Sequence, residues 1–171
     1  MELTGKRVAI LIENMYQEQE FWYPFYRMKE AGATVTIVGS GAKEYHGQVG
    51  LLAPGGVSVE SLNAMDFDAI IVPGGFAPDR MRRNPAMLKL VSDCFNQGKI
   101  VAAICHAGWV LVSAGILKGK MATGNVAIKD DMVNAGATYL NQEVVKDGNL
   151  ITSRSPDDLP AFCREIILAL K

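Results

Sequence analysis

The sequence has little of several features that mark particular classes of protein. Its formal net charge is only -1, from 17 Lys and Arg against 18 Asp and Glu, so it has no basic surplus for nucleic acid or a membrane surface. It has three cysteines, an odd number whose spacing fits neither a zinc site nor a redox pair. No run approaches the roughly 18 apolar residues of a membrane-spanning helix. These absences favour a globular chain without nucleic-acid, membrane or metal partners.

The N-terminal segment also lacks the pattern of a secretory leader. Its apolar stretch is short and ends at Glu13, and no small-residue cleavage site follows. Cysteines without an evident disulfide pattern suit a reducing compartment, so the expected location is cytoplasmic. Hydrophobic residues make up 49% and charged residues 20% of the 171 residues, as in globular proteins. A chain of this length is expected to form one domain, residues 1–171, with a full core.

Short apolar runs alternate with helical segments along the whole chain. The runs predict buried strands at 7–12, 34–39, 67–75 and 99–104, and hairpins or loops at 40–64 and 143–154. Helices are expected at 21–32, with Pro24 in the first turn or causing a kink, and at 85–97, 108–115, 128–137 and 157–171. This alternation predicts an α/β fold, a three-layer sandwich with a mostly parallel sheet.

The run IVAAICHAGWVLV, residues 100–112, places Cys105 beside one of only two histidines. Cys105 falls where a strand ends and a helix begins, which is typical of a nucleophile elbow. The amides and dipole of that helix are expected to lower the pKa of the thiol and to stabilise an oxyanion. Cys94 and Cys163 lie within predicted helices and are expected to be inert. The pattern therefore favours Cys105 as a nucleophile.

His106 is expected to act as general base or ion-pair partner of the Cys105 thiol. A histidine in this role needs a carboxylate that orients its second nitrogen. Three carboxylates follow the ends of other predicted strands: Asp79 after the third strand, and Glu18 and Glu20 after the first. The residues alone leave all three open.

Four segments together resemble the ThiJ/PfpI superfamily, and more closely its PfpI-type intracellular cysteine peptidase branch. They are AICHAG, FDAIIVPGGFAPDR, IKDDMVNAGA and LITSRSPDDLPAF, and the resemblance runs from about Lys6 to the C-terminus. It implies a flavodoxin-like sandwich related to class I glutamine amidotransferase domains. It implies no cofactor.

The resemblance also implies a set of site residues. Cys105 and His106 would be the reactive pair, and Glu20 would lie against the cysteine sulfur. In the PfpI branch an acidic residue of a neighbouring subunit, in a GG-x-A-P-E-R segment, completes the triad. Here the segment reads GGFAPDR, which places Asp79 at that position. Gly75 and His106 would form the oxyanion hole. The protein would then be a homo-oligomer, a dimer or a hexamer, with a site shared between subunits.

The sequence departs from the family pattern at three positions of the expected pocket wall. Many relatives read ICHGP where this chain reads ICHAG, followed by Trp109. Asn125 stands where an aromatic residue is common, and Gln17 where a glutamate is common. These changes are expected to alter substrate preference.

Three functions fit these residues. The first is a Cys-His-Asp hydrolase, a peptidase or amidase. The second is an enzyme of the glyoxalase III or protein deglycase type, acting on methylglyoxal, glyoxal or their adducts. The third is a non-enzymatic, redox-sensing stress protein whose oxidised Cys105 is held by Glu20. Because a sensor needs only an accessible thiol of low pKa, the adjacent His106 favours an enzyme acting on a small carbonyl or a peptide.

Overall fold

A seven-stranded sheet forms the centre of the protein in a computed structural model that describes residues 1–171. The strands in spatial order are β10 (Val144–Asp147), β11 (Leu150–Ser153), β7 (Ile100–Ile104), β6 (Ala69–Val72), β1 (Arg7–Leu11), β2 (Thr34–Gly39) and β5 (Val57–Ser58). All neighbours are parallel except β10 and β11, which form the expected hairpin. The prediction of a mostly parallel sheet is confirmed.

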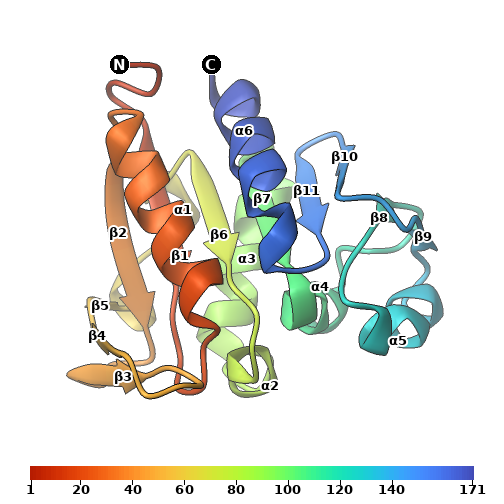
Figure 1. Cartoon of the computed structure of the whole chain (residues 1–171), viewed down its shortest axis with the longest axis horizontal. Helices are drawn as coiled ribbons and strands as arrows, with labels where there is room; N and C mark the ends of the chain where they lie inside the picture. Colours follow the sequence, from red (N-terminus) through yellow and green to blue (C-terminus); the bar gives the residue numbers. More distant parts are fainter.

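Helices cover both faces of this sheet. Figure 1 shows α1 (Glu18–Glu30) and α6 (Leu159–Leu170) in front of it, and α3 (Pro85–Asn96) behind. Every residue of β6 and β7 is buried, which explains why these strands read as unbroken apolar runs. Fifty of the 68 buried residues form one hydrophobic cluster. The three-layer α/β sandwich predicted from the sequence is confirmed, and none of its helices has the length and hydropathy to span a membrane.

Shorter elements surround the carboxyl ends of the central strands. The helices α2 (Ala77–Met81), α4 (Gly108–Ser113) and α5 (Lys129–Asn134) lie there, low in the view of Figure 1. Two small sheets accompany them, an antiparallel pair of β3 (Glu44–His46) with β4 (Leu52–Pro54) and a parallel pair of β8 (Met121–Ala122) with β9 (Thr138–Tyr139). Because β1, β6 and β7 are parallel, the segments that follow them meet at this edge.

Several elements differ from the expected bounds, and two of these differences concern the site. The helix α1 begins at Glu18, three residues early, because the Gln17 side chain caps it by accepting the Glu20 amide at 2.8 Å. Pro24 therefore lies inside α1 instead of in its first turn. The helix α2 was not expected, since five residues are too few to show a helical period.

Candidate active site

Cys105 occupies a strained turn at the end of β7. Its φ is 61°, and Met15 is the only other residue besides glycines with a positive φ. The strand ends in extended conformation at Ile104, and a single 3-10 turn, η3 (Cys105–Ala107), leads into α4. A left-handed conformation costs a non-glycine residue about 1–2 kcal/mol. The turn directs the side chain away from the sheet, in the geometry of a nucleophile elbow.

Two glycines after β6 allow the backbone to approach Cys105 closely. A Cβ atom at Gly74 would lie 2.5 Å from Oε2 of Glu20 and 2.8 Å from Cβ of Cys105. Gly75 has a φ of 81°, and a Cβ there would lie 2.6 Å from the backbone nitrogen of Gln17. A larger residue at Gly74 would therefore push against both Glu20 and Cys105, and one at Gly75 would push against the segment that precedes α1.

Glu20 is fully buried in the first turn of α1, facing Cys105. Its Oε2 accepts the Gly74 amide at 2.8 Å. Its Oε1 has no hydrogen-bond partner, and the Cys105 side chain lies close enough to the carboxyl group to affect its pKa. Burial raises the pKa of Glu20 to about 7, although the Gly74 and Cys105 contacts act in the opposite direction. Glu20 thus exchanges a proton near neutral pH.

The pKa of the Cys105 thiol moves in the direction opposite to that expected from the sequence. Burial, and after it the charge of Glu20, raises this pKa to about 12, while the His106 and Gly75 amides that face the sulfur lower it. The expected lowering is wrong because η3 is one short turn, whose dipole and amides do not outweigh desolvation. A charged Glu20 repels a thiolate at Cys105, so the two side chains together favour a single negative charge. When Cys105 is a thiolate, Glu20 is therefore protonated.

His106 lies beside the nucleophile, with its Nδ1 3.3 Å from the Cys105 sulfur. Its ring is half-buried, and this burial lowers the pKa of His106, which favours the neutral form of the imidazole. The Trp109 ring meets it edge-on at 5.3 Å between centroids. The indole Nε1 donates to Asp131 at 2.8 Å, and the Arg82 guanidinium lies over the indole. Within the chain, an anchored aromatic ring rather than a carboxylate contacts His106.

The other two candidate carboxylates lie elsewhere. Asp79, on α2, pairs with Arg83 at 2.9 Å and has no hydrogen bond or ion pair with His106 within the chain. Glu18 accepts the Val49 amide at 2.7 Å and braces the loop between β3 and β4. Of the three open carboxylates, the structure brings only Glu20 to the sulfur.

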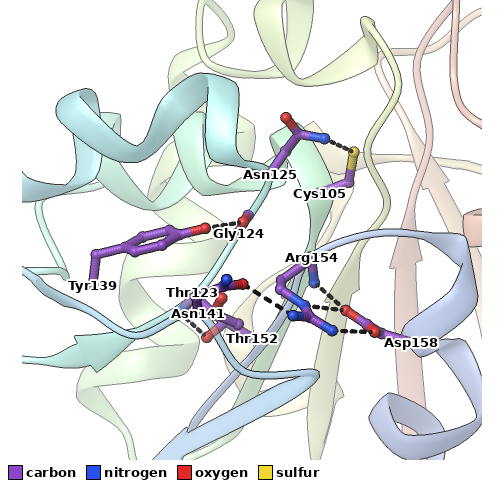
Figure 2. A network of polar contacts seen from close by, with 9 residues as sticks. All are labelled: Cys105, Thr123, Gly124, Asn125, Tyr139, Asn141, Thr152, Arg154 and Asp158. Atoms are coloured by element: carbon purple, nitrogen blue, oxygen red, sulfur yellow. Dashed lines mark hydrogen bonds and ion pairs between the residues drawn. The ribbon is translucent and has the colours of Figure 1, made fainter.

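Asn125 is a polar contact of the nucleophile that the sequence did not assign. Its Nδ2 lies 3.7 Å from the Cys105 sulfur, as Figure 2 shows. The sequence marked this position only as a departure from an aromatic residue. Asn125 caps the 3-10 turn η4 (Val126–Ile128). This turn is only three residues long, which is too short to show a periodic pattern in the sequence, so the position of the Asn125 amide against the sulfur could not be predicted.

The aromatic run FWYPFY divides between core and surface. Phe21 is fully buried, whereas Tyr26 is exposed. A surface groove of about 750 Å³ runs between this face of α1 and the beginning of α6, lined by Trp22, Tyr26 and Pro160 among others. Neither Cys105 nor His106 lines it, so the groove is separate from the candidate active site.

The model of the DJ-1/PfpI family matches residues 6–169. The chain belongs to the DJ-1/PfpI family. It is 39% identical over 165 residues to "Deglycase PfpI" of Pyrococcus furiosus, covering 96% of this chain and 99% of that one. It is 38% identical over 168 residues to "Putative cysteine protease YraA" of Bacillus subtilis, covering 98% and 99%.

A solved structure from Anabaena variabilis has the same fold in one of its parts. This two-domain protein contains DJ-1/ThiJ/PfpI-like and ferritin-like domains, and it matches with a TM-score of 0.95 and 46% identity. The match covers 96% of this chain and 48% of the Anabaena chain, so this chain spans about half of that protein. The family membership expected from the four sequence segments is confirmed.

Proposed function

We propose that the protein is a cysteine-dependent enzyme of the deglycase type, in which Cys105 attacks the carbonyl carbon of a small substrate. One observation carries this proposal: the sulfur faces two backbone amides, the His106 imidazole and the Glu20 carboxyl group, yet Cys105 is only 8% exposed. An opening this narrow suits a small carbonyl group better than an extended polypeptide. The name of the Pyrococcus relative supports the same choice.

The first step uses only groups that contact the sulfur. The thiol gives its proton to Glu20 or to Nδ1 of His106, and the sulfur lone pair forms a bond to the carbonyl carbon. The π electrons of the carbonyl move onto its oxygen, which takes a negative charge. The amides of Gly75 and His106 face this region and would hold the oxyanion. Protonation of that oxygen by the imidazolium or by Glu20 then gives a neutral thiohemiacetal or tetrahedral adduct.

Peptide or amide hydrolysis is the second candidate, favoured by the name of the Bacillus relative. It shares the first step and differs in the leaving group, an amine that must be protonated before it departs. A peptide substrate also needs a cleft beside the nucleophile. The large surface groove does not supply it within one chain, because neither Cys105 nor His106 lines that groove.

We also propose that a second copy of the chain completes the site. His106 has no orienting carboxylate within its own chain, and the Asp79 side chain is 55% exposed on the short helix α2. Phe76, at the start of the same helix, is exposed as well. An acidic and apolar surface of this kind suits a contact in which Asp79 reaches His106 of a neighbouring subunit.

The test compares two substrates with the purified protein. Consumption of methylglyoxal, or release of an amine from its adduct, is expected, and hydrolysis of a fluorogenic peptide is expected to be slower. Both activities should be lost in Cys105→Ser, since a serine hydroxyl does not ionise near neutral pH. Peptide hydrolysis without any dicarbonyl activity would replace the first candidate by the second.

A further inference from the structure

Asn125 contacts the nucleophile residue twice. Its backbone amide donates to the Cys105 carbonyl at 3.2 Å, and its side-chain Nδ2 lies 3.7 Å from the Cys105 sulfur. The distance of 3.7 Å between Nδ2 and the sulfur is that of a hydrogen bond to sulfur. Figure 2 shows the carboxamide above the strand end, with its nitrogen toward the thiol.

The orientation of this carboxamide is fixed by a second contact. Its Oδ1 accepts the Ala127 amide at 3.0 Å, which caps η4. If the carboxamide were rotated by half a turn, its NH₂ group would face the Ala127 N–H, and two donors would oppose each other. The capping contact therefore assigns the oxygen to η4 and leaves the NH₂ group for the sulfur.

Two hydrogen bonds brace the backbone that leads to Asn125. The Tyr139 hydroxyl donates to the Gly124 carbonyl at 2.7 Å, and the Thr123 amide donates to the Thr152 hydroxyl at 2.8 Å, both visible in Figure 2. A Cβ atom at Gly124 would lie 3.3 Å from the Cys105 carbonyl oxygen, so this segment runs close against the elbow. The donor is therefore in place before any substrate arrives.

We propose that Asn125 is a further catalytic residue, whose side-chain NH₂ group donates a hydrogen bond to the Cys105 sulfur and stabilises the negative charge that develops there. This inference rests on the proposed function of Cys105 as a nucleophile. The titratable groups that face the sulfur are Glu20, from α1, and His106, from η3. Because a carboxamide does not titrate, its contribution persists at every pH at which these two groups change charge.

The experiment measures the rate of Cys105 alkylation by iodoacetamide against pH, with peptide mapping to identify the labelled residue. The variant Asn125→Asp keeps the capping oxygen and replaces the donor by a second carboxylate oxygen. Asn125→Ser keeps a capping hydroxyl but is too short to reach the sulfur. The pH midpoint should rise by about one unit or more in both variants, and labelling at neutral pH should slow by about tenfold, more in Asn125→Asp.

The chain offers a matched control in Asn63→Asp. Asn63 also caps a 3-10 turn, η2 (Ala64–Asp66), and its Oδ1 accepts the Met65 amide at 2.9 Å. It precedes β6, so it lies at the edge of the sheet opposite to Cys105. Its alkylation profile should equal that of the unmodified protein, and thermal melting followed by circular dichroism should show that all variants are folded.

An unchanged alkylation profile in both folded Asn125 variants would overturn the inference. A slower rate with an unchanged midpoint would also overturn it, since that result indicates altered access rather than lost charge stabilisation. Alkylation needs no substrate, so its outcome is independent of turnover. Absence of both carbonyl and peptide turnover in the unmodified protein would refute the proposed function while leaving the donor role of Asn125 to be decided by the alkylation profile.

Discussion

Replacing Glu20 by glutamine should change how the stability of the protein depends on pH. The difference in the free energy of unfolding between Glu20→Gln and the unmodified protein should shift in favour of the variant as pH rises. Glutamine keeps the size of a protonated glutamate, and its Oε1 can still accept the Gly74 amide. It carries no charge, so it removes the cost of ionising a fully buried carboxyl group beside a thiol. Burial sets the direction of this effect, because it raises the pKa of Glu20 from 4.5 to about 7.

The magnitude follows from linkage. A rise from 4.5 to about 7 corresponds to about 3 kcal/mol at 1.36 kcal/mol per unit. Since the folded state holds this proton more tightly than the unfolded state, the free energy of unfolding falls as pH rises from about 4.5 to about 7. The charge is shared with Cys105 and the site can relax, so we expect a relative gain of about 1–3 kcal/mol for Glu20→Gln between pH 4 and pH 8.

Urea unfolding at a series of pH values measures this difference directly. All groups other than Glu20 titrate in both proteins, so their contributions cancel in the difference between the two free energies. Glu60→Gln serves as the control, because Glu60 is exposed in η1 (Val59–Ser61). A difference between Glu20→Gln and the unmodified protein that is independent of pH would refute a raised pKa at Glu20.

Two further outcomes follow from the geometry of the site. Cys105 should react with iodoacetamide at least about tenfold faster than Cys94 and Cys163, because it is 8% exposed and lies beside the His106 imidazole whereas they are 0% and 1% exposed, and equal rates would contradict the elbow. Mixing inactive Cys105→Ala subunits with inactive Asp79→Ala subunits should restore part of the activity, because some interfaces pair an intact cysteine with an intact aspartate. Loss of the orienting carboxylate can cost up to about ten-thousandfold in rate, so full activity in Asp79→Ala alone would exclude this role.

The sequence predicted most of the sheet and the place of the nucleophile, because both depend on local patterns. The unbroken apolar run of β7 marks a strand buried on both faces, and its last residue fixes where Cys105 must lie. The direction of the thiol pKa could not be predicted in this way. It depends on how deeply the sulfur is buried and on Glu20, which is 85 positions away in the sequence and reaches Cys105 only in the folded protein.

The choice between Glu18 and Glu20 shows a similar limit. Both residues follow β1, and composition alone leaves both as partners of the cysteine. Two positions apart on a helix, their side chains point in different directions, so only one of them can face the elbow. The structure directs Glu18 to the Val49 amide and Glu20 to Gly74 and Cys105. Family resemblance had assigned Glu20 to the sulfur, and physical pattern could not have done so.

Pro24 removes one helical hydrogen bond from the backbone of Glu20. Proline has no N–H, so the carbonyl of the residue four positions earlier, which is Glu20, loses its helical partner. The first turn of α1 is therefore less restrained by the helix itself, and other contacts fix it. The Gln17 side chain holds the Glu20 amide, and the Gly74 amide holds its carboxyl group. The position of the proton acceptor is thus set by residues that follow β1 and β6, beside the β7 end that carries the nucleophile, rather than by the body of the helix.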